Sequence, residues 1–300
     1  MVWRSFSMNK TELVALPANL AGTSPNPPVS VIINVFNEAN TIEHEIREIH
    51  AKIIQKLPGS ELIVAEDGST DGTKKILERL KGELGIIHST SQERKGYAKA
   101  FRDAVMLARN PYIFFSDTGG KQDFTDFWKL YPHCDRYGII SGIRSGRRDQ
   151  FYRRLMTGVY NFLLRRYFRV NLHDADAGFR IYQARVIRKI ANEPWVNRHL
   201  ISSELALRAI YSGFEVKEVP VLYRKRLGAS RGLPLGKVPK VIIGVLRNFS
   251  RLKNVLTSPG YRVTSASTDL RIHGQRNTAT STINRSCSDS DEVDPPQVKP

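Results

Sequence analysis

Short apolar strands alternate with helical patterns through the first half of this chain. Apolar runs stand at 29–36, 61–66, 84–89 and 111–117, and a further strand is expected at 137–143. Strands that are apolar throughout are typical of a sheet buried on both faces, and helices between them indicate parallel βαβ units. The sequence therefore predicts an α/β fold with a mostly parallel central sheet flanked by helices.

The helix after the first strand carries a start signal and an apolar stripe. Asn40 and Glu43 have the spacing of a capping box. The stripe recurs every three or four residues, at Ile42, Ile46, Ile49 and Ile53. We therefore expect a helix that begins at Asn40 and packs on the sheet.

After about residue 150 the pattern becomes less regular. Helices are expected at 151–168 and 199–213, a strand at 178–183 and extended chain at 214–226. A further helix, at 238–256, has an apolar stripe opposite a basic face. We divide the chain into an irregular segment (1–27), one domain (28–236), an amphipathic basic helix (237–256) and a polar tail predicted to be disordered (257–300).

Positive charge is concentrated in two segments. The formal net charge is +17, and eight arginines with one aspartate lie between Arg144 and Arg169. Nine lysines or arginines and no acid lie between Arg224 and Lys253. Such concentration favours an anionic partner, which can be nucleic acid, phospholipid head groups or a phosphorylated substrate.

Cysteine usage and hydropathy bear on the compartment. The two cysteines, Cys134 and Cys287, lie far apart and give no disulfide framework or zinc pattern. The longest candidate membrane run, 241–246, is far shorter than a spanning helix, and no signal peptide is evident at the N-terminus. We expect a cytoplasmic protein whose membrane contact, on the cytoplasmic face, is peripheral or made through a membrane-protein partner.

Polar residues follow the first four predicted strands. Glu38 follows the first strand, Asp67-Gly68 the second and Lys95-Gly96 the third, while Asp117 ends the fourth. Ligands bind beyond the carboxyl ends of parallel strands, where acids accept hydrogen bonds from a base or ribose and glycines admit the ligand close to the backbone. Any one of these positions is also explained as turn chemistry. Their joint arrangement favours a nucleotide site.

At these residues the chain resembles the family 2 glycosyltransferases, which have the Rossmann-like GT-A fold. The resemblance rests on VSVIINVFNEANTI and IVAEDGSTDGT and covers about residues 28–255. The stretches DADAGFRIY (174–182) and LGASR (227–231) favour the branch of dolichol-phosphate mannose synthases and other polyprenyl-phosphate glycosyltransferases. The resemblance implies a nucleotide-sugar donor linked to UDP or GDP, a polyprenyl-phosphate acceptor and a divalent metal, Mg²⁺ or Mn²⁺.

The family's roles transfer to matching positions of this sequence. The resemblance implies that the base and ribose contact Phe36, Glu38 and Asp67, with Gly68 beside them, and that Lys95 and Gly96 lie in the loop beside the nucleotide. Asp117 is the first acid of the metal motif. Arg180, Arg226 and Ser230 are expected near the phosphates of donor or acceptor.

The metal motif departs from the family pattern. Gly119 replaces the second acid, and either Lys121 or Gln122 occupies the following glutamine position. One carboxylate with diphosphate oxygens and water can hold Mg²⁺ or Mn²⁺, or Lys121 can supply a cation instead. We expect a metal site weaker than the family norm, with Asp117 as its protein ligand, and the alternative is a surface turn without activity.

The chemistry depends on the acceptor. A polyprenyl phosphate is already ionised and needs no general base, whereas a sugar hydroxyl does. Asp174 can orient the acceptor, act as that base, or pair with a nearby arginine, and Asp176 is the less favoured acid because it does not fall on the matching position. Glu204 is expected to pair with Arg208 or contact the acceptor, and His173 to be structural.

The leading prediction is an inverting transferase that moves a hexose-type sugar from a nucleotide sugar to polyprenyl phosphate. Asp117, Asp174 and Lys121 are its candidate catalytic residues. The alternatives are transfer to a glycan hydroxyl and a non-catalytic nucleotide-sugar or lipid-binding relative. The basic surface is assigned to an anionic membrane rather than to nucleic acid, because no nucleic-acid motif is present. The base, the sugar and the oligomeric state stay open.

Overall fold

The computed structural model describes residues 26–120, 122–146, 151–196, 201–224, 238–259 and 261. Within helices, the side chains of 151–153 and 238–241 are outside this description. All described residues belong to one unit, Met1–Ala266.

Seven strands form one sheet in the order β3-β2-β1-β4-β6-β5-β7. Only β6 runs against its neighbours, and the other pairings in the sheet are parallel. Because of this reversal, the segment that enters β6 lies at the same edge as the carboxyl ends of the other strands. The strands are β1 (Val29–Val35), β2 (Glu61–Glu66), β3 (Ile87–Ser89), β4 (Tyr112–Asp117), β5 (Ile139–Ser145), β6 (Phe179–Gln183) and β7 (Val216–Leu222).

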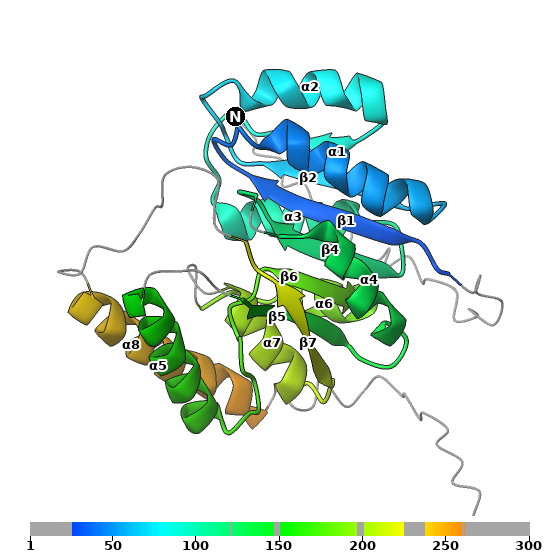
Figure 1. The fold of residues 1–300 in the computed structure, drawn as a ribbon. Coiled ribbons are helices and arrows are strands. Elements are labelled where there is room, and N and C mark those ends of the chain that lie inside the picture. Colours follow the sequence, from blue (N-terminus) through cyan, green and yellow to red (C-terminus); the bar gives the residue numbers. More distant parts are fainter. Residues whose placement is uncertain are drawn as a thin grey trace, which may run out of the picture. The chain divides into compact units, whose positions relative to one another are not determined.

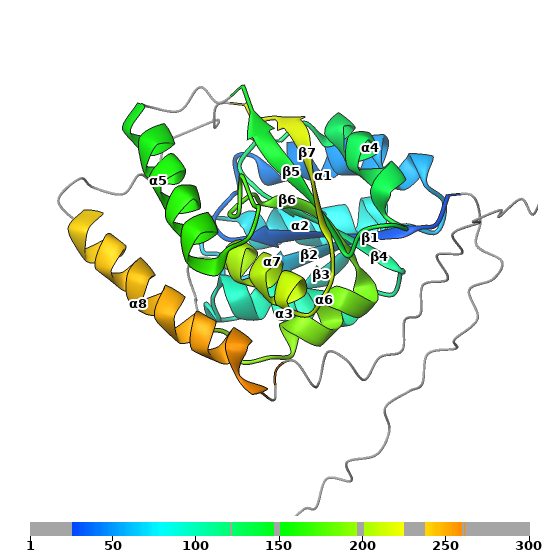
Figure 2. The same cartoon turned by 90° about the horizontal axis from the view of Figure 1, so that it is seen from below.

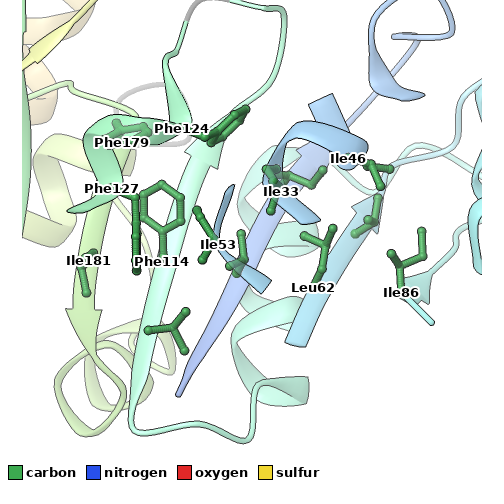
Figure 3. Close-up of a cluster of buried hydrophobic side chains, with 14 of the residues drawn as sticks. Ile33, Ile46, Ile53, Leu62, Ile86, Phe114, Phe124, Phe127, Phe179 and Ile181 are labelled. Atoms are coloured by element: carbon green, nitrogen blue, oxygen red, sulfur yellow. The ribbon is translucent and has the colours of Figure 1, made fainter. Parts of the chain in front are cut away.

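One face of the sheet is covered by α1 (Ile42–Lys52), α2 (Thr73–Leu84) and α4 (Phe127–Leu130) (Figure 1). Two short 3-10 turns flank α4, at Phe124–Asp126 and Tyr131–His133, and another follows α1 at Ile54–Lys56. The predicted isoleucine stripe of α1 is fully buried here. The stripe belongs to one buried cluster with Phe114, Phe127 and Phe179, and Figure 3 shows Ile53 beside Phe114.

The opposite face is covered by α3 (Tyr97–Leu107), α6 (Ala184–Ala191) and α7 (Ile201–Tyr211) (Figure 2). Phe101 of α3 packs edge-on against Phe115 of β4, with ring centroids 4.9 Å apart. Both faces of β4 are therefore buried. The end of that strand, Asp117, is fixed between two packed layers.

Two further helices lie side by side beyond α7, α5 (Phe151–Phe168) and α8 (Val238–Thr257) (Figures 1 and 2). Phe168 of α5 and Phe249, Leu252 and Leu256 of α8 are buried in a third cluster with Leu207 of α7. One side of the basic helix thus packs on the domain. None of the described helices is both long enough and apolar enough to cross a bilayer.

The mostly parallel sheet flanked by helices confirms the predicted fold class, with corrections in detail. The helix α1 begins at Ile42, and Thr41 rather than Asn40 is its N-cap, with no side-chain cap. The third strand is shorter than predicted, and α6 and α4 were not predicted. The segments 1–25 and 262–300, including most of the tail expected to be disordered, lie outside the described residues.

A buried ion pair holds α7 in place. Glu204 and Arg208, each 1% exposed, face each other one turn apart, with 2.8 Å between Oε1 and Nη2. Arg208 also pairs with Glu193 and donates to the Pro194 carbonyl. Of the two roles expected for Glu204, the structure gives it the pairing with Arg208.

We expect Arg208→Ala to lower the free energy of unfolding by about 3–5 kcal/mol, because it leaves the Glu204 carboxylate buried without its partner. Urea denaturation measures the loss. The matched control is Arg79→Ala on α2, an exposed arginine that pairs with Glu43, for which the expected loss is much smaller because water screens the pair. Equal losses in the two variants would contradict this account of α7.

Candidate active site

The loops that follow β1 and β2 brace each other at the carboxyl edge of the sheet. The Asn37 side chain accepts from the Thr70 amide at 2.9 Å, and the Asn37 amide donates to the Ser69 hydroxyl at 3.0 Å. Asn37 has a φ of 53°, a left-handed conformation that asparagine tolerates. This brace fixes Phe36 and Glu38 on either side of Asn37.

Phe36 lies beneath the guanidinium of Arg94, which stands 4.0 Å from the ring centroid. Arg94 belongs to the loop after β3, and its Nε is 3.8 Å from the Asp67 carboxylate. A flat cationic group thus covers the aromatic face that we expect to contact a base. The base would therefore have to displace Arg94 or stack beside it.

Asp67 ties the loop after β2 to the loop after β3. Its Oδ1 accepts from the backbone amides of Lys95 and Gly96, both at 2.8 Å. The two loops touch at Gly68, where an added Cβ would lie 2.6 Å from the backbone nitrogen of Arg94. The Lys95 ammonium is 2.7 Å from Asp103 of α3. The predicted nucleotide-binding residues therefore come together in one braced group.

Asp117 ends β4 within this group. The Tyr97 hydroxyl, from the start of α3, donates to its Oδ1 at 2.9 Å. The carboxylate also packs against Gly178, where a Cβ would fall 1.8 Å from Oδ2. The Asp117 amide donates to the Gly178 carbonyl at 2.8 Å. Asp117 is therefore held from α3 on one side and from the entry to β6 on the other.

The turn after Asp117 is anchored by a carboxylate from α1. Glu45 is 2% exposed, and its Oε1 accepts from the Gly119 amide at 2.9 Å and the Gly120 amide at 2.8 Å. Burial raises the pKa of Glu45, and the two amides oppose that rise. Both glycines have positive φ, 107° and 66°, where other residues are strained. Gly119 thus belongs to a backbone turn that Glu45 determines.

Asp174 has the structural role named above as one of its alternatives. It is 4% exposed and forms a two-pronged ion pair with Arg144, whose backbone amide also donates to it. Its own amide donates to Glu218 at 3.0 Å. His173 also contacts Glu218, with 2.8 Å between Nδ1 and Oε2, consistent with its expected structural role.

Arg180 supports the loop that contains Asp174. It is 1% exposed, and its guanidinium donates to Ser141, Ser202 and the Ala175 carbonyl. The phosphate contact that we expected of Arg180 therefore has no support among the described contacts. Its guanidinium instead fixes the segment between Asp174 and Gly178.

Asp176 lies in that segment, two residues before the glycine that touches Asp117. No hydrogen bond or ion pair joins its side chain to another described residue. Although it keeps some exposed surface, desolvation raises the pKa of Asp176 to about 6; Arg144 opposes the rise and Asp117 adds to it. Asp117 and Asp176 are therefore two neighbouring carboxylates with unequal surroundings.

This carboxylate pair is compatible with a divalent ion that also binds a diphosphate. The described residues contain no group of three or more histidines, cysteines or acids that could hold a metal alone. Mg²⁺ and Mn²⁺ accept oxygen ligands, and Mg²⁺ commonly keeps one or two carboxylates and fills its sphere with phosphate and water. Asp117 and Asp176 would supply the protein ligands.

Three predicted site residues, Lys121, Arg226 and Ser230, lie outside the described residues. Sequence reasoning missed Tyr97 and Glu45 and set Asp176 second to Asp174. Tyr97 had a signal, since it follows Lys95-Gly96 at a helix start. Glu45 had a weaker one, an acid on the border of the apolar stripe of α1.

The comparisons define the class of protein. Residues 30–191, more than half of the chain, match the family model Glycosyl transferase family 2. The chain therefore belongs to the family 2 glycosyltransferases, as the sequence motifs predicted.

Curated relatives include proteins named as dolichyl-phosphate sugar transferases. The chain is 31% identical over 210 residues to glycosyltransferase AglD of Haloferax volcanii, a match covering 67% of this chain and 34% of AglD. It is 27% identical over 211 residues to the dolichyl-phosphate hexose transferase of the same organism, covering 68% of this chain and 86% of that protein. A dolichyl-phosphate beta-glucosyltransferase of Drosophila melanogaster is 26% identical, covering 66% of this chain and 67% of its own length.

Solved structures share the fold. The mannosyltransferase PcManGT of Pyrobaculum calidifontis, solved with GDP-Man and Mn²⁺, superposes with a TM-score of 0.53 at 19% identity, covering 80% of this chain and 73% of its own. The glucosyl-3-phosphoglycerate synthase of Mycobacterium tuberculosis, solved with Mn²⁺ and UDP-Glc, superposes with a TM-score of 0.57 at 17% identity. The match covers 75% of this chain and 80% of that protein. These likenesses establish the GT-A fold.

The Glu45 anchor predicts a specific pH dependence of stability. A carboxyl whose pKa is raised on folding adds stability below its unfolded pKa of about 4.3 and loses that contribution as pH rises through the folded pKa. We therefore expect the unfolding free energy of Glu45→Gln, relative to the natural protein, to increase as pH rises above that value. Urea titrations at several pH values measure the difference.

Glu45→Ala is the contrasting variant. It leaves the amides of Gly119 and Gly120 without their acceptor, at a cost of about 1–3 kcal/mol. Gln retains an acceptor oxygen, so it should be the milder change at neutral pH. A Gln variant as unstable as the Ala variant would contradict the role of Glu45 as the acceptor for these two amides.

Proposed function

We propose that this protein is an inverting glycosyltransferase that moves a hexose-type sugar from a nucleotide sugar to a polyprenyl phosphate. The observation that carries the proposal is the edge of the sheet where Asp117 stands between Tyr97 and Gly178, in a chain of family 2 whose relatives include dolichyl-phosphate hexosyltransferases. Both UDP- and GDP-linked donors occur among the structural neighbours. We therefore propose a nucleotide-sugar donor without assigning its base or its sugar.

The braced loops supply the donor site. Phe36, with Arg94, offers an aromatic and cationic surface for the base, while Glu38 and Asp67 offer acceptors for ribose or base donors. Asp117 lies where the diphosphate meets the sheet. Lys95 and Gly96 continue the loop that borders the nucleotide.

Transfer exchanges one bond for another. A phosphate oxygen of the polyprenyl phosphate bonds to the anomeric carbon, and the bond from that carbon to the nucleoside diphosphate breaks, with its electron pair on the leaving group. Attack from the opposite side inverts the configuration. The acceptor is already ionised, so no proton has to be removed. This fits Asp174, whose carboxylate is committed to Arg144.

A divalent ion, when bound, would neutralise the leaving diphosphate. Asp117 and Asp176 would hold it, with Lys121 as a further candidate cation. Tyr97 and Gly178 keep the Asp117 carboxylate in one orientation. We propose that Mg²⁺ or Mn²⁺ serves here with few protein ligands.

Membrane contact belongs to the same proposal, because a polyprenyl phosphate resides in a bilayer. The basic helices α5 and α8 favour an anionic membrane surface, met directly or through a membrane-protein partner. We place the protein peripherally on the cytoplasmic face.

Asp176 supports a second candidate, transfer to a glycan hydroxyl. Its carboxyl, with a pKa raised to about 6 chiefly by desolvation, is suited to a general base. Asp176→Asn separates the candidates. A variant that loses Mn²⁺ affinity favours the metal role, whereas one that keeps Mn²⁺ affinity and loses turnover favours the base and the hydroxyl acceptor.

The direct test is turnover. Purified protein is incubated with labelled UDP- or GDP-sugars and a polyprenyl phosphate in detergent, and the lipid fraction is analysed for a sugar-phosphate lipid and its anomeric configuration. The expected product has the configuration inverted from the donor. Nucleotide binding without turnover on any donor would favour the non-catalytic alternative.

Gly178→Ala tests whether the position of Asp117 controls nucleotide binding. The added methyl would displace the Asp117 carboxylate. A nucleotide at 100 times its dissociation constant stabilises a protein by roughly 2.7 kcal/mol, and we expect the Mn²⁺-dependent part of this protection to be lost in Gly178→Ala and Asp117→Asn. Thermal unfolding with UDP or GDP, in Mn²⁺ or EDTA, measures it.

The control is Gly158→Ala in α5, where nothing lies within 4 Å of an added Cβ. It should keep the protection and gain about 0.5–1 kcal/mol of helix stability. Undiminished metal-dependent protection in Gly178→Ala would remove Asp117 from the proposed metal site.

A further inference from the structure

The outer sides of α5 and α8 are unusually apolar. Ten large hydrophobic side chains of the described residues are more than a third exposed, and six of them lie on these two helices. The most exposed is Phe162, at 60%. The six are Leu155, Val159, Phe162, Ile243, Leu246 and Val255.

On α5 these residues form a single stripe. Leu155, Val159 and Phe162 are spaced by four and three residues, so they share one face of the helix. That face is distinct from the one buried against α7, which carries Leu164 and Phe168. Contiguous exposed apolar surface of this kind marks an interaction site.

A groove opens between the same two helices. It encloses about 260 Å³, and its apolar walls come from Leu163 of α5 and from Leu246 and Phe249 of α8. Leu246 belongs both to the groove and to the exposed apolar set. The groove is therefore continuous with the apolar surface of α8.

Three cations line the groove as well: Arg166, Arg169 and Lys253. The Lys253 ammonium donates to the Tyr167 carbonyl at 3.0 Å and lies 4.6 Å from the ring centroid of Tyr167. Among the described residues, no carboxylate lies within ion-pair distance of these cations. The sequences of both helices contain no acid at all. The groove thus has apolar walls and uncompensated positive charge.

These features match one kind of ligand, an amphiphile with an anionic head. An acidic peptide would satisfy the cations and leave the stripe around Phe162 uncovered. A nucleic acid would do the same. A bilayer covers both, because its phosphates meet the cations while its acyl chains receive the apolar side chains.

We infer that the groove between α5 and α8 binds the phosphate head group of an anionic membrane phospholipid, with Leu155, Val159 and Phe162 entering the acyl layer beside it. This lipid is separate from the polyprenyl acceptor. The inference deepens the membrane contact of the proposed function and does not depend on turnover.

The test is vesicle flotation with phosphatidylcholine alone or mixed with phosphatidylglycerol. We compare the natural protein with the triple variant Arg166→Gln/Arg169→Gln/Lys253→Gln. Each charge near an anionic surface strengthens binding roughly fivefold, so the triple variant should bind phosphatidylglycerol vesicles roughly 100-fold more weakly. The natural protein should bind phosphatidylcholine weakly.

The matched control removes the same charge elsewhere, as Lys56→Gln/Lys75→Gln/Lys81→Gln on and near α1 and α2. Its affinity should fall by no more than about threefold, because screening limits charges far from the bilayer. The exposed pair Arg166→Gln/Arg169→Gln is tested alone, since Lys253 also packs on Tyr167. Phe162→Ser should weaken binding while leaving its dependence on phosphatidylglycerol intact.

Equal losses in the triple variant and the lysine control would overturn the inference. So would vesicle binding that requires added polyprenyl phosphate, because the groove would then belong to the acceptor. Nucleotide protection is measured on every variant. If nucleotides protect neither the natural protein nor any variant against unfolding, the proposed transferase activity is contradicted. The inferred phospholipid groove is judged separately, by whether vesicle binding depends on the three cations.

Discussion

The contact between the Asp117 carboxylate and the backbone of Gly178 is the constraint on which the candidate site depends. It joins the end of β4 to the entry of β6, the one strand that runs against the others. Because residue 178 has no side chain, the carboxylate lies directly on the backbone. The segment carrying Asp176 is thereby brought to the same edge of the sheet as the loops that follow β1, β2 and β3.

Charged groups that are buried or partly buried hold the loops around this contact. Glu45 fixes the turn after Asp117, Arg180 fixes the segment before Gly178, and Arg144 occupies Asp174. Each of these groups is at least partly desolvated and is satisfied by hydrogen bonds, so removing one partner is costly. Such a fixed arrangement would suit the proposed transfer, in which the donor diphosphate and the acceptor phosphate have to be oriented.

Periodicity predicted the strands and most helices, because burial on one or both faces leaves a local trace in the sequence. The reversed direction of β6 left no such trace, and the N-cap of α1 was misplaced because Thr41 rather than Asn40 ends the preceding turn. Motifs placed Phe36, Asp67 and Asp117 at one edge. They ranked Asp174 above Asp176, because they could not show that Asp174 pairs with Arg144, which is thirty residues away in the chain. Glu45 was missed for the same reason: its partners are 74 and 75 residues distant.

The short segment between α5 and β6 limits how far the reaction centre can stand from a bilayer. Arg169, in the groove, precedes Asp176 by only seven residues, and a fully extended chain of that length spans roughly 25 Å at most. With α5 at the membrane surface, the carboxylates are confined to a thin layer of water above the lipid phosphates. A polyprenyl phosphate could then meet the donor while its isoprenoid chain stays in the bilayer. The length of this connection would therefore set an upper limit on the distance between the reaction centre and the membrane surface.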